Sequence, residues 1–343
     1  MKLREWLDHG AALLSESPHP DRARRDAETL LLHHIGKNKA WLMAHDDEQF
    51  AGCSSIGYAT LLERRCKGEP IQYLTGECEF YGLPFHVTPD VLIPRPETEH
   101  LVEKVFEIAS QSRGEDPPEG PRTLGASSIS LGAPGPSPLG TGETISRSYT
   151  DLAAPSKPPH LRLGWESKKP DQPQRILDVG TGSGAIAVAL AKQIPNAAIT
   201  AIDISDAALS IARNNAKRNE VAIRFLHGDL LAPVVGEQFE IIVSNPPYVP
   251  NTDRALIAVE VREHEPAVAL FGGEDGLAIY RRLIPAAHAA LVPSGCLLFE
   301  FGFSQMPDIE TLLKQAGFQN IEFIHDLQGI PRVASAQKAS NNS

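Results

Sequence analysis

A polar segment directly follows an apolar run in the C-terminal half, where IIVSNPPYVP occupies residues 241–250. The run ends at Asn245, and Pro246 and Pro247 separate it from Tyr248. Each proline fixes φ near about −65° and removes a backbone donor, and the first proline also restricts the residue before it. Such a segment is suited to hold backbone carbonyls and one side-chain amide in a set geometry. It is also typical of a strand-ending turn, because Asn and Pro are common turn residues.

A glycine-rich loop joins the apolar run RILDV to a predicted helix, as Gly180-Thr-Gly-Ser-Gly184. Glycine lets the backbone approach a ligand closely beside a helix N-terminus, although any tight strand-to-helix turn can use it. Dinucleotide enzymes space these glycines as G-x-G-x-x-G. Here the spacing is one residue tighter and Asp178 precedes the loop, a form that resembles motif I of class I S-adenosylmethionine-dependent methyltransferases. The resemblance implies that this cofactor contacts Gly180, Thr181, Gly182, Ser183 and Gly184.

Two aspartates end the next two apolar runs. Asp203, 23 residues after Gly180, can accept both hydroxyls of a ribose, a device that NAD enzymes share. Asp229 stands where this superfamily often places an acid beside the adenine amine, and Leu230 would pack against the ring. Taken alone, Asp229 is as typical of a loop or N-cap aspartate. The loop, Asp203, Asp229 and Asn245 in register favour S-adenosylmethionine over NAD.

The Asn-Pro-Pro-Tyr segment then has a chemical interpretation. An amide or aromatic amine nitrogen is a poor nucleophile because its lone pair is delocalised. The side-chain oxygen of Asn245 and the carbonyl of Pro246 are acceptors that can aim this lone pair, and they bind more strongly as positive charge reaches the nitrogen. Tyr248 can pack against the planar group, and Pro247 completes the substrate contacts. The segment is the [DNS]-P-P-[FYW] signature of methyltransferases that act on planar amines in glutamine, adenine or guanine.

Alternating strands and helices are predicted from Arg175 onward. Five short apolar runs are predicted to be buried strands: RILDV, AITAID, IRFLHG, FEIIVSN and CLLFEFG. Helical stretches at 185–192 and 206–218 lie between the first three of these runs. This alternation predicts an α/β fold with a doubly wound, mostly parallel sheet. Ligands bind at the carboxyl ends of the strands in such sheets, so Asp203, Asp229 and Asn245 should face one crevice.

The N-terminal part is predicted to be helical over residues 1–75. Apolar residues recur there at helical spacing: Leu3, Trp6, Leu7, Leu13 and Leu14, then 26–32, then Tyr58, Leu61 and Leu62. We interpret His33 and His34 as surface or packing residues, because no acidic or cysteine partner stands at metal spacing, and we predict no metal site. A β-hairpin linker is predicted over 76–97.

The remaining domain is predicted to span 98–334, with a helix over 98–109 and an insert at 111–173. The insert holds eleven of the 28 prolines, with many Gly and Ser and no apolar periodicity, so we expect it to be disordered. Residues 335–343 are predicted to form a flexible tail.

Overall charge and cysteine content limit the functional classes. The net charge of −11 argues against nucleic-acid binding over a broad surface, because phosphate neutralisation supplies much of that affinity. Cys53, Cys66, Cys78 and Cys296 show no metal-ligand or C-x-x-C spacing, which favours free thiols in a reducing compartment. The N-terminus lacks the apolar core of a signal peptide, and no run is long enough for a membrane span. We therefore expect a cytoplasmic protein.

Longer stretches extend the resemblance to nearly the whole chain outside 111–173. They are residues 68–103 (GEPIQYLTGECEFYGLPFHVTPDVLIPRPETEHLVE), ILDVGTGSGAIAVALA, SNPPYVP, FGGEDGLAIYRRLI and DLQGIPRV. In combination they resemble the release factor glutamine methyltransferase (PrmC/HemK) family. The resemblance implies a seven-stranded sheet, a helical domain that docks the substrate protein, and methylation of the Gly-Gly-Gln glutamine of class 1 peptide chain release factors by a monomeric enzyme. It also implies that residues 93–98 line the site entrance.

Three other functions share part of this sequence pattern. A DNA adenine methyltransferase shares the glycine loop and the Asn-Pro-Pro-Tyr segment, but it needs a base-flipping apparatus and a phosphate-binding surface, which the acidic charge disfavours. A catalytically silent S-adenosylmethionine-binding scaffold has no need of Asn245 and Tyr248. A dehydrogenase is the weakest of the three, because its glycine spacing differs.

Overall fold

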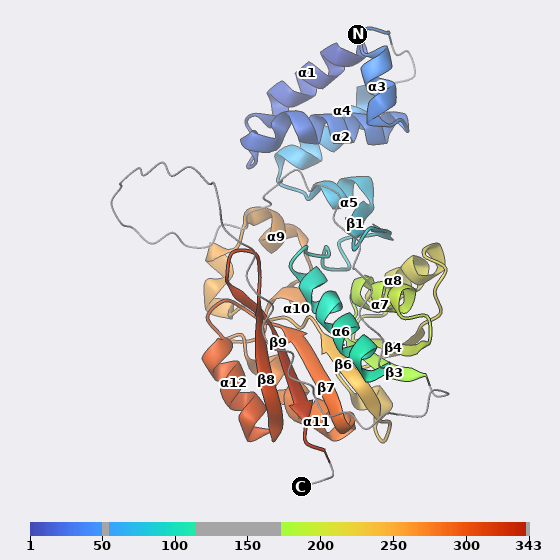
Figure 1. The fold of residues 1–343 in the computed structure, drawn as a ribbon. Helices are drawn as coiled ribbons and strands as arrows, with labels where there is room; N and C mark the ends of the chain where they lie inside the picture. The colour runs from blue at the N-terminus through green and yellow to red at the C-terminus, as the bar shows by residue number, and fades with distance from the viewer. Residues whose placement is uncertain (50–54, 114–172, 341–343) are drawn as a thin grey trace, which may run out of the picture.

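The computed structural model describes residues 1–49, 55–113 and 173–340. They form a small helical domain at one end of the molecule, a hairpin, and a larger α/β domain (Figure 1). Most of the predicted insert, residues 114–172, lies outside the described residues. Its predicted start at 111 is wrong, because α6 (Thr98–Arg113) continues through that position.

The helical domain contains more helices than the sequence pattern predicted. They are α1 (Leu3–Leu14), η1 (Pro20–Arg22), α2 (Ala23–Ile35), α3 (Lys39–His45), α4 (Ser55–Cys66) and α5 (Ile71–Thr75). Tyr58 of α4 is fully buried at its centre and donates a hydrogen bond to the Ala27 carbonyl at 3.0 Å. Gly10 of α1 is needed beside it, because a Cβ at this position would overlap the tyrosine hydroxyl. Leu13, which the pattern placed on the apolar stripe, is 43% exposed.

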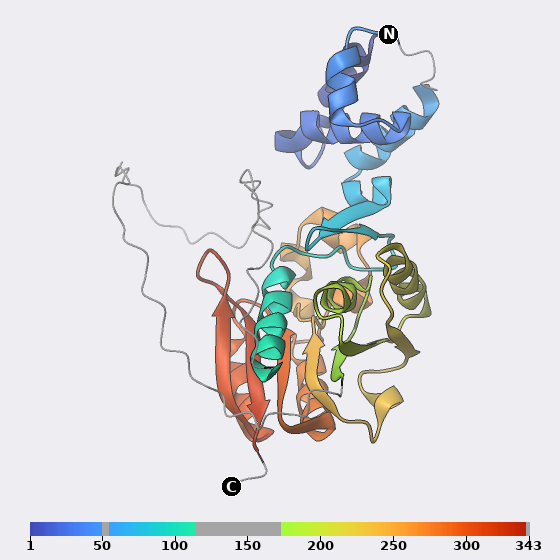
Figure 2. The same cartoon turned by 45° about the vertical axis from the view of Figure 1, so that its right-hand side comes forward.

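A two-stranded antiparallel hairpin connects the helical domain to the α/β domain (Figure 2). Its strands are β1 (Glu77–Phe80) and β2 (Leu83–His86). Phe80 and Phe85 pack edge to face and are buried against the α/β domain. Asn215 of α8 (Asp206–Arg218) accepts from the backbone N–H of His86 and donates to its carbonyl, so the end of the hairpin is fixed to a helix beside the glycine loop.

The α/β domain is built on a seven-stranded sheet in the order β5-β4-β3-β6-β7-β9-β8. The strands are β3 (Gln174–Val179), β4 (Ala197–Asp203), β5 (Arg224–His227), β6 (Phe239–Ser244), β7 (Leu291–Glu300), β8 (Phe318–His325) and β9 (Pro331–Lys338). The first five are parallel and β9 is antiparallel to both of its neighbours. The predicted doubly wound, mostly parallel seven-stranded sheet is confirmed. The predicted flexible tail from residue 335 is not confirmed over 335–338, because β9 continues the sheet to Lys338 and contains buried residues.

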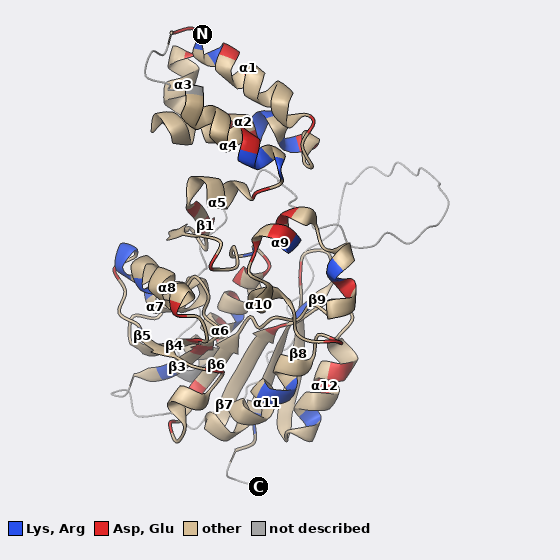
Figure 3. Cartoon of the chain, turned by 180° about the vertical axis from the view of Figure 1, so that it is seen from behind, with Lys and Arg blue, Asp and Glu red and all other residues tan. Residues whose placement is uncertain are grey.

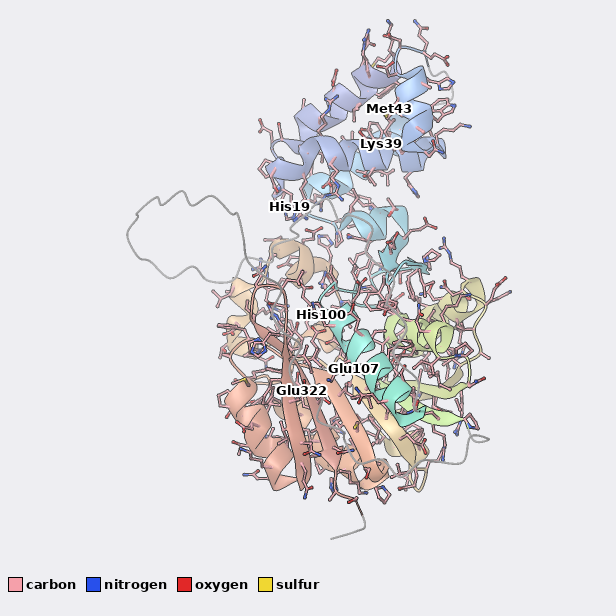
Figure 4. All side chains as sticks on the ribbon, in the orientation of Figure 1. His19, Lys39, Met43, His100, Glu107 and Glu322 are labelled. Carbon is pink, nitrogen blue, oxygen red and sulfur yellow. The ribbon has the colours of Figure 1, made fainter. Side chains whose placement is uncertain are left out.

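Helices cover both faces of this sheet (Figures 1 and 2). Alternate strand residues serve the two faces: Ile176 packs with α6 and α7 (Ala185–Gln193), and Leu177 packs on the opposite side with α11 (Ala278–Ala290). The helix α12 (Met306–Gln315) joins α11 on that face. Lys104 of α6 pairs with Glu107 and with Glu322 of β8, at 3.1 and 2.9 Å, which ties this helix across the sheet (Figure 4).

The order of the strands creates a switch point between β3 and β6. The chain runs from β3 outward through β4 to β5, and from β6 outward in the other direction to β7. Connections on the two sides therefore diverge, which opens a crevice at the carboxyl ends of β3 and β6. The short elements η2 (Ala232–Val234), η3 (Asn251–Leu256), α9 (Val259–His264) and α10 (Ala267–Leu270) complete the domain, and the last three follow β6 beside this crevice.

Candidate active site

A cavity opens at this switch point, bounded by the ends of four parallel strands and by the segment before α6. Ten of the predicted site residues line it: Gly180, Thr181, Gly182, Ser183, Asp203, Asp229, Leu230, Asn245, Pro246 and Pro247. Pro94, Arg95 and Thr98 also line it, so the 93–98 segment contributes to its wall. Gly184 and Tyr248 are not among the lining residues.

The glycine loop has a backbone that side chains would disfavour. Gly180, Gly182 and Gly184 have φ values of +74°, +54° and +83°, in the left-handed region that only glycine adopts readily. Gly184 is different in its role, because a Cβ there would lie 3.1 Å from the Cβ of Ala212 in α8. It therefore serves the close packing of α7 against α8, while Gly180 and Gly182 present their backbone to the cavity.

Asp203, at the end of β4, is held by backbone donors on both sides. Its Oδ2 accepts from Gly182 N at 2.8 Å, and its Oδ1 accepts from Ser205 N at 2.9 Å. Each carboxylate oxygen has capacity for a further donor. The arrangement fits a bidentate contact to the two hydroxyls of a ribose placed in the cavity.

Asp178 lies behind the same loop and is fully buried. Its Oδ2 accepts from the Thr181 hydroxyl at 2.7 Å. Burial raises the pKa of this carboxyl to about 7; the Thr181 hydrogen bond opposes the shift, and the nearby charge of Asp203 adds to it. The Asp178 carboxyl therefore supports the glycine loop through Thr181 and does not line the cavity.

Asp229 has a partner that the sequence did not indicate. Its Oδ2 accepts from the guanidinium of Arg282 in α11, and both residues line the cavity. Leu230, next along the chain, adopts a φ of +49° and also faces the cavity. Asp229 thus lines the cavity, and its carboxylate is paired with an arginine.

The Asn245 side chain is fixed by two acceptors at the end of β6. Its Nδ2 donates to Thr98 Oγ1 and to Glu300 Oε2, both at 3.0 Å. The NH₂ group is anchored on this side, so Oδ1 is the group left to face the cavity.

Glu300, behind the cavity, is a second residue that the sequence pattern did not indicate. It ends β7, is 2% exposed, and also accepts from the Thr98 hydroxyl at 2.6 Å and from the Tyr248 hydroxyl at 3.2 Å. Burial raises the pKa of Glu300, while the Thr98 and Tyr248 hydrogen bonds oppose the shift. Burial also raises the pKa of Tyr248. A charged residue inside the apolar run CLLFEFG was the available signal.

Tyr248 is consequently oriented toward Glu300 through its hydroxyl, rather than toward the cavity. The backbone around it is held by the segment 270–276: Val249 N donates to Leu270 O, and Gly272 N donates to Val249 O, both at 2.9 Å. Gln305 Nε2 donates to the Tyr248 carbonyl at 2.9 Å. These contacts fix the loop that carries Pro246 and Pro247.

A partly buried ion pair lies in the cavity wall formed by the segment before α6. Arg95 donates to Glu265, whose carboxylate is 1% exposed on its side chain and also accepts from Ile93 N at 3.4 Å. The pair joins the segment before α6 to the residue after α9, on the side of the cavity nearest the helical domain.

Comparison with known proteins identifies the family of the chain. The sequence profile of the Methyltransferase small domain matches residues 166–263, and that of the PrmC N-terminal domain matches residues 5–76. The "Release factor glutamine methyltransferase" of Koribacter versatilis is 35% identical over 99% of this chain and 100% of that protein. The chain belongs to the release factor glutamine methyltransferase family. Proteins of the same name from Geobacter sulfurreducens and Deinococcus radiodurans are 33% and 35% identical, over 98% and 99% of this chain and 96% and 99% of theirs.

Three further features of the described residues limit the chemistry of the protein. No group of three or more His, Cys, Asp or Glu side chains in 1–49, 55–113 and 173–340 is placed to hold a metal ion. None of the helices in those ranges is long and apolar enough to cross a membrane. The three cysteines among them, Cys66, Cys78 and Cys296, are free thiols.

Proposed function

We propose that this protein transfers a methyl group from S-adenosylmethionine to the side-chain amide nitrogen of the glutamine in the Gly-Gly-Gln motif of class 1 peptide chain release factors. The observation that carries the proposal is the fixed amide of Asn245, whose Nδ2 donates to Thr98 and Glu300, at the edge of a cavity suited to a nucleoside. Full-length relatives named for the same activity support it.

The cavity lining fits the cofactor in chemistry as well as in position. Asp203 would hold the ribose hydroxyls, Asp229 and Leu230 would meet the adenine, and the loop from Gly180 to Ser183 would approach the methionine end. Gly184 would support that loop from behind. When bound, the sulfonium supplies an electrophilic methyl group.

The residues of the Asn-Pro-Pro-Tyr loop would bind and orient the substrate amide. Asn245 Oδ1 and the Pro246 carbonyl accept its two N–H bonds, which turns the nitrogen lone pair out of conjugation. As positive charge develops on the nitrogen, those two hydrogen bonds strengthen, so they stabilise the transition state more than the ground state. Pro247 keeps the loop rigid, and Tyr248 acts through Glu300 at the back of the loop.

The partner and setting follow from this substrate. The helical domain at 1–75, joined through the hairpin linker at 76–97, is the part that we propose docks the release factor. With a net charge of −11, the chain lacks the overall positive charge that stable nucleic-acid binding favours. We infer a monomeric enzyme that works in the cytoplasm, where release factors act.

The test is transfer of labelled methyl from S-adenosylmethionine to an unmodified release factor, with the wild-type chain and with Asn245→Ala. We expect the label on the Gly-Gly-Gln glutamine, and a rate about 10²–10³-fold lower in the variant, as for the loss of one preorganised transition-state contact. The matched control is Asn251→Ala, because Asn251 lies six residues later on the exposed end of the same connection.

Two results would contradict the proposal. Label that appears on DNA adenine and not on the release factor would establish the alternative amine substrate. An Asn245→Ala rate equal to that of Asn251→Ala would remove the Asn245 amide from the reaction.

A further inference from the structure

The Glu300 carboxylate lies behind the Asn245 amide and is not among the residues that line the cavity. It is nearly fully buried, and its three donors are the neutral side chains of Thr98, Tyr248 and Asn245. Those donors come from α6 and from the loop after β6, and Glu300 itself ends β7. Burying a carboxylate costs free energy unless hydrogen bonds or an opposite charge compensate for the lost solvation. The position of Glu300 behind the Asn245 amide therefore needs a functional explanation.

The hydrogens of this cluster determine which way the Asn245 amide points. The Thr98 hydroxyl has one hydrogen and directs it to Glu300 Oε2 at 2.6 Å, so toward Asn245 Nδ2 it can only accept. The same Nδ2 also donates to Glu300 Oε2 at 3.0 Å. If the amide turned over, its oxygen would face the carboxylate oxygen, and two acceptors would repel each other. The ionised carboxylate thus excludes the reversed amide.

The charge of Glu300 has a second effect on the proposed reaction. Positive charge moves from the sulfonium to the substrate nitrogen during methyl transfer, and that nitrogen is bound on the far side of the Asn245 amide. A negative charge in a buried site acts more strongly than in water because the effective dielectric constant is lower. Glu300 polarises the Asn245 amide so that its oxygen becomes a better acceptor as the charge develops.

We propose that Glu300, together with Thr98, is a positioning residue for methyl transfer, which holds the Asn245 amide with its oxygen toward the substrate nitrogen. The inference rests on the proposed glutamine methylation, but it concerns residues outside the predicted Asn-Pro-Pro-Tyr and glycine-loop motifs.

Protonation of Glu300 would release the amide. Burial raises the pKa of this carboxyl, and the charged or titratable groups that face it are Tyr248, Glu97 and Arg332, from three different segments. The hydroxyl of Tyr280, from α11, donates to the Glu300 backbone carbonyl at 2.7 Å. Because the active form is the ionised one and the folded pKa is raised, the transfer rate should fall as the pH drops through that pKa.

The kinetic test is single-turnover methyl transfer at saturating S-adenosylmethionine and release factor, which reports chemistry apart from binding. Glu300→Gln and Thr98→Val should be about 10–100-fold slower than wild type, in the range seen for residues that orient a site ligand from behind. Thr98→Ser, which keeps the hydroxyl, should restore the rate. The acid limb of the pH profile should be absent in Glu300→Gln.

The matched control is Glu240→Gln, the same change at a buried carboxylate of β6 that accepts from Arg175 N at 2.7 Å, away from the cavity lining. Affinity for S-adenosylhomocysteine and the melting temperature are recorded for every variant. A Glu300→Gln rate within about twofold of Glu240→Gln, with the acid limb retained, would overturn the proposal.

A second measurement needs no substrate. The side-chain NH₂ signal of Asn245, assigned by its loss in Asn245→Ala, should be protected from exchange in the free wild-type protein and should titrate with Glu300. Both properties should disappear in Glu300→Gln. An unprotected, pH-independent signal in the wild type would overturn the positioning role. If the wild type labels no release factor while the amide is protected, the proposed function fails and the positioning role stands.

Discussion

At the scale of single residues, the cavity depends on buried carboxylates that lie behind its lining. Asp178 supports the glycine loop through Thr181, and Glu300 supports Asn245. Burial raises the pKa of both carboxyls. Burial therefore favours the neutral form of each carboxyl in the folded protein, which predicts a measurable dependence of stability on pH.

The substitution Asp178→Asn tests this at the glycine loop. The wild-type carboxyl has a pKa of about 7 in the folded state, against an ordinary value of 3.8. A raised folded pKa gives stability that is fully present below about pH 4 and is lost as the pH rises to about 7. Asparagine does not titrate, so the unfolding free energy of the variant minus that of wild type should increase by about 2–3 kcal/mol from pH 5 to pH 8. Urea unfolding at the two pH values measures it, and a difference that does not change with pH would contradict it.

The sequence pattern predicted the residues that line the cavity better than the residues that position them from behind. Asp203 and Asn245 were predicted because they follow apolar runs at the carboxyl ends of strands, and the structure places both at the cavity. Glu300 and Arg282 were not predicted, because their partners are 55 and 53 residues away in sequence. No local spacing reports such pairings: the first exists only once β6 and β7 lie side by side, and the second only once α11 lies beside the loop after β5.

At the scale of elements, the Asn-Pro-Pro-Tyr loop is held by the glycine-rich segment that follows α10. A Cβ on Gly272 would lie 2.6 Å from the Pro247 carbonyl oxygen, and one on Gly276 would overlap the Tyr248 carbonyl oxygen. Side chains at these positions would therefore push directly on the backbone that presents the substrate acceptors. The backbone of residues 270–276 therefore fixes the position of the loop.

The substitution Gly276→Ala should displace the loop and slow methyl transfer about tenfold or more, since misplacement of reacting groups is costly. The control is Gly236→Ala, because Gly236 has a φ of +83° against +74° for Gly276 but no atom within 4 Å of an added Cβ. The control should show only the left-handed backbone penalty, roughly 1–2 kcal/mol, with an unchanged transfer rate. Thermal unfolding and single-turnover transfer measure the two effects. Equal rates for both variants would show that the loop tolerates the shift.

Element prediction succeeded where apolar runs alternated with helices. The five predicted strands correspond to β3, β4, β5, β6 and β7. The antiparallel pair β8 and β9 was less apparent, because partly exposed and polar residues interrupt its apolar pattern, as in FQNIEFIH. Its presence was implied only by the family resemblance, which brought in a seven-stranded sheet.

At the scale of the whole molecule, the helical domain is joined to the α/β domain by ionic contacts as well as by the chain. Arg65 of α4, 1% exposed, donates to Asp26 of α2 at 2.7 Å and to Glu260 of α9 at 2.9 Å. His19 approaches the other oxygen of Glu260 at 2.8 Å, at the junction of the two domains (Figure 4). Figure 3 shows charged residues of both signs on α4 and α9 where these helices approach each other.

This junction lies on the side of the proposed active site. Glu260 lies in the first turn of α9 and Glu265 directly follows the helix, and Glu265 binds Arg95 in the cavity wall. A docked substrate protein that contacts both domains would therefore meet a geometry set partly by Arg65. The cofactor cavity is farther along the same wall and includes no residue of the helical domain among its lining.

The substitution Arg65→Met tests the coupling of the two domains. It removes the charge that Asp26 and Glu260 share, and the loss of one partner from a buried ion pair typically costs about 3–5 kcal/mol. Of the three tryptophans, Trp6, which packs edge to face on buried Tyr58, and Trp41 in α3 lie in the helical domain, so fluorescence measured with Trp165→Phe in every variant follows that domain. We expect the transition to shift to lower urea. We also expect kcat/KM for release factor to fall, with unchanged affinity for S-adenosylhomocysteine.

The control for this substitution is Arg4→Met, which removes an arginine from an exposed pair with Asp47 in the same domain. Such surface pairs contribute about 0–1 kcal/mol, so its unfolding should nearly match wild type. Glu260→Gln separates the two roles of Arg65, because it leaves the Asp26 pair inside the helical domain and weakens only the contact to α9. If Glu260→Gln lowers kcat/KM for release factor without moving the fluorescence transition, the junction orients the domains for the substrate. If Arg65→Met behaves like Arg4→Met in both measurements, the buried arginine contributes neither to stability nor to docking.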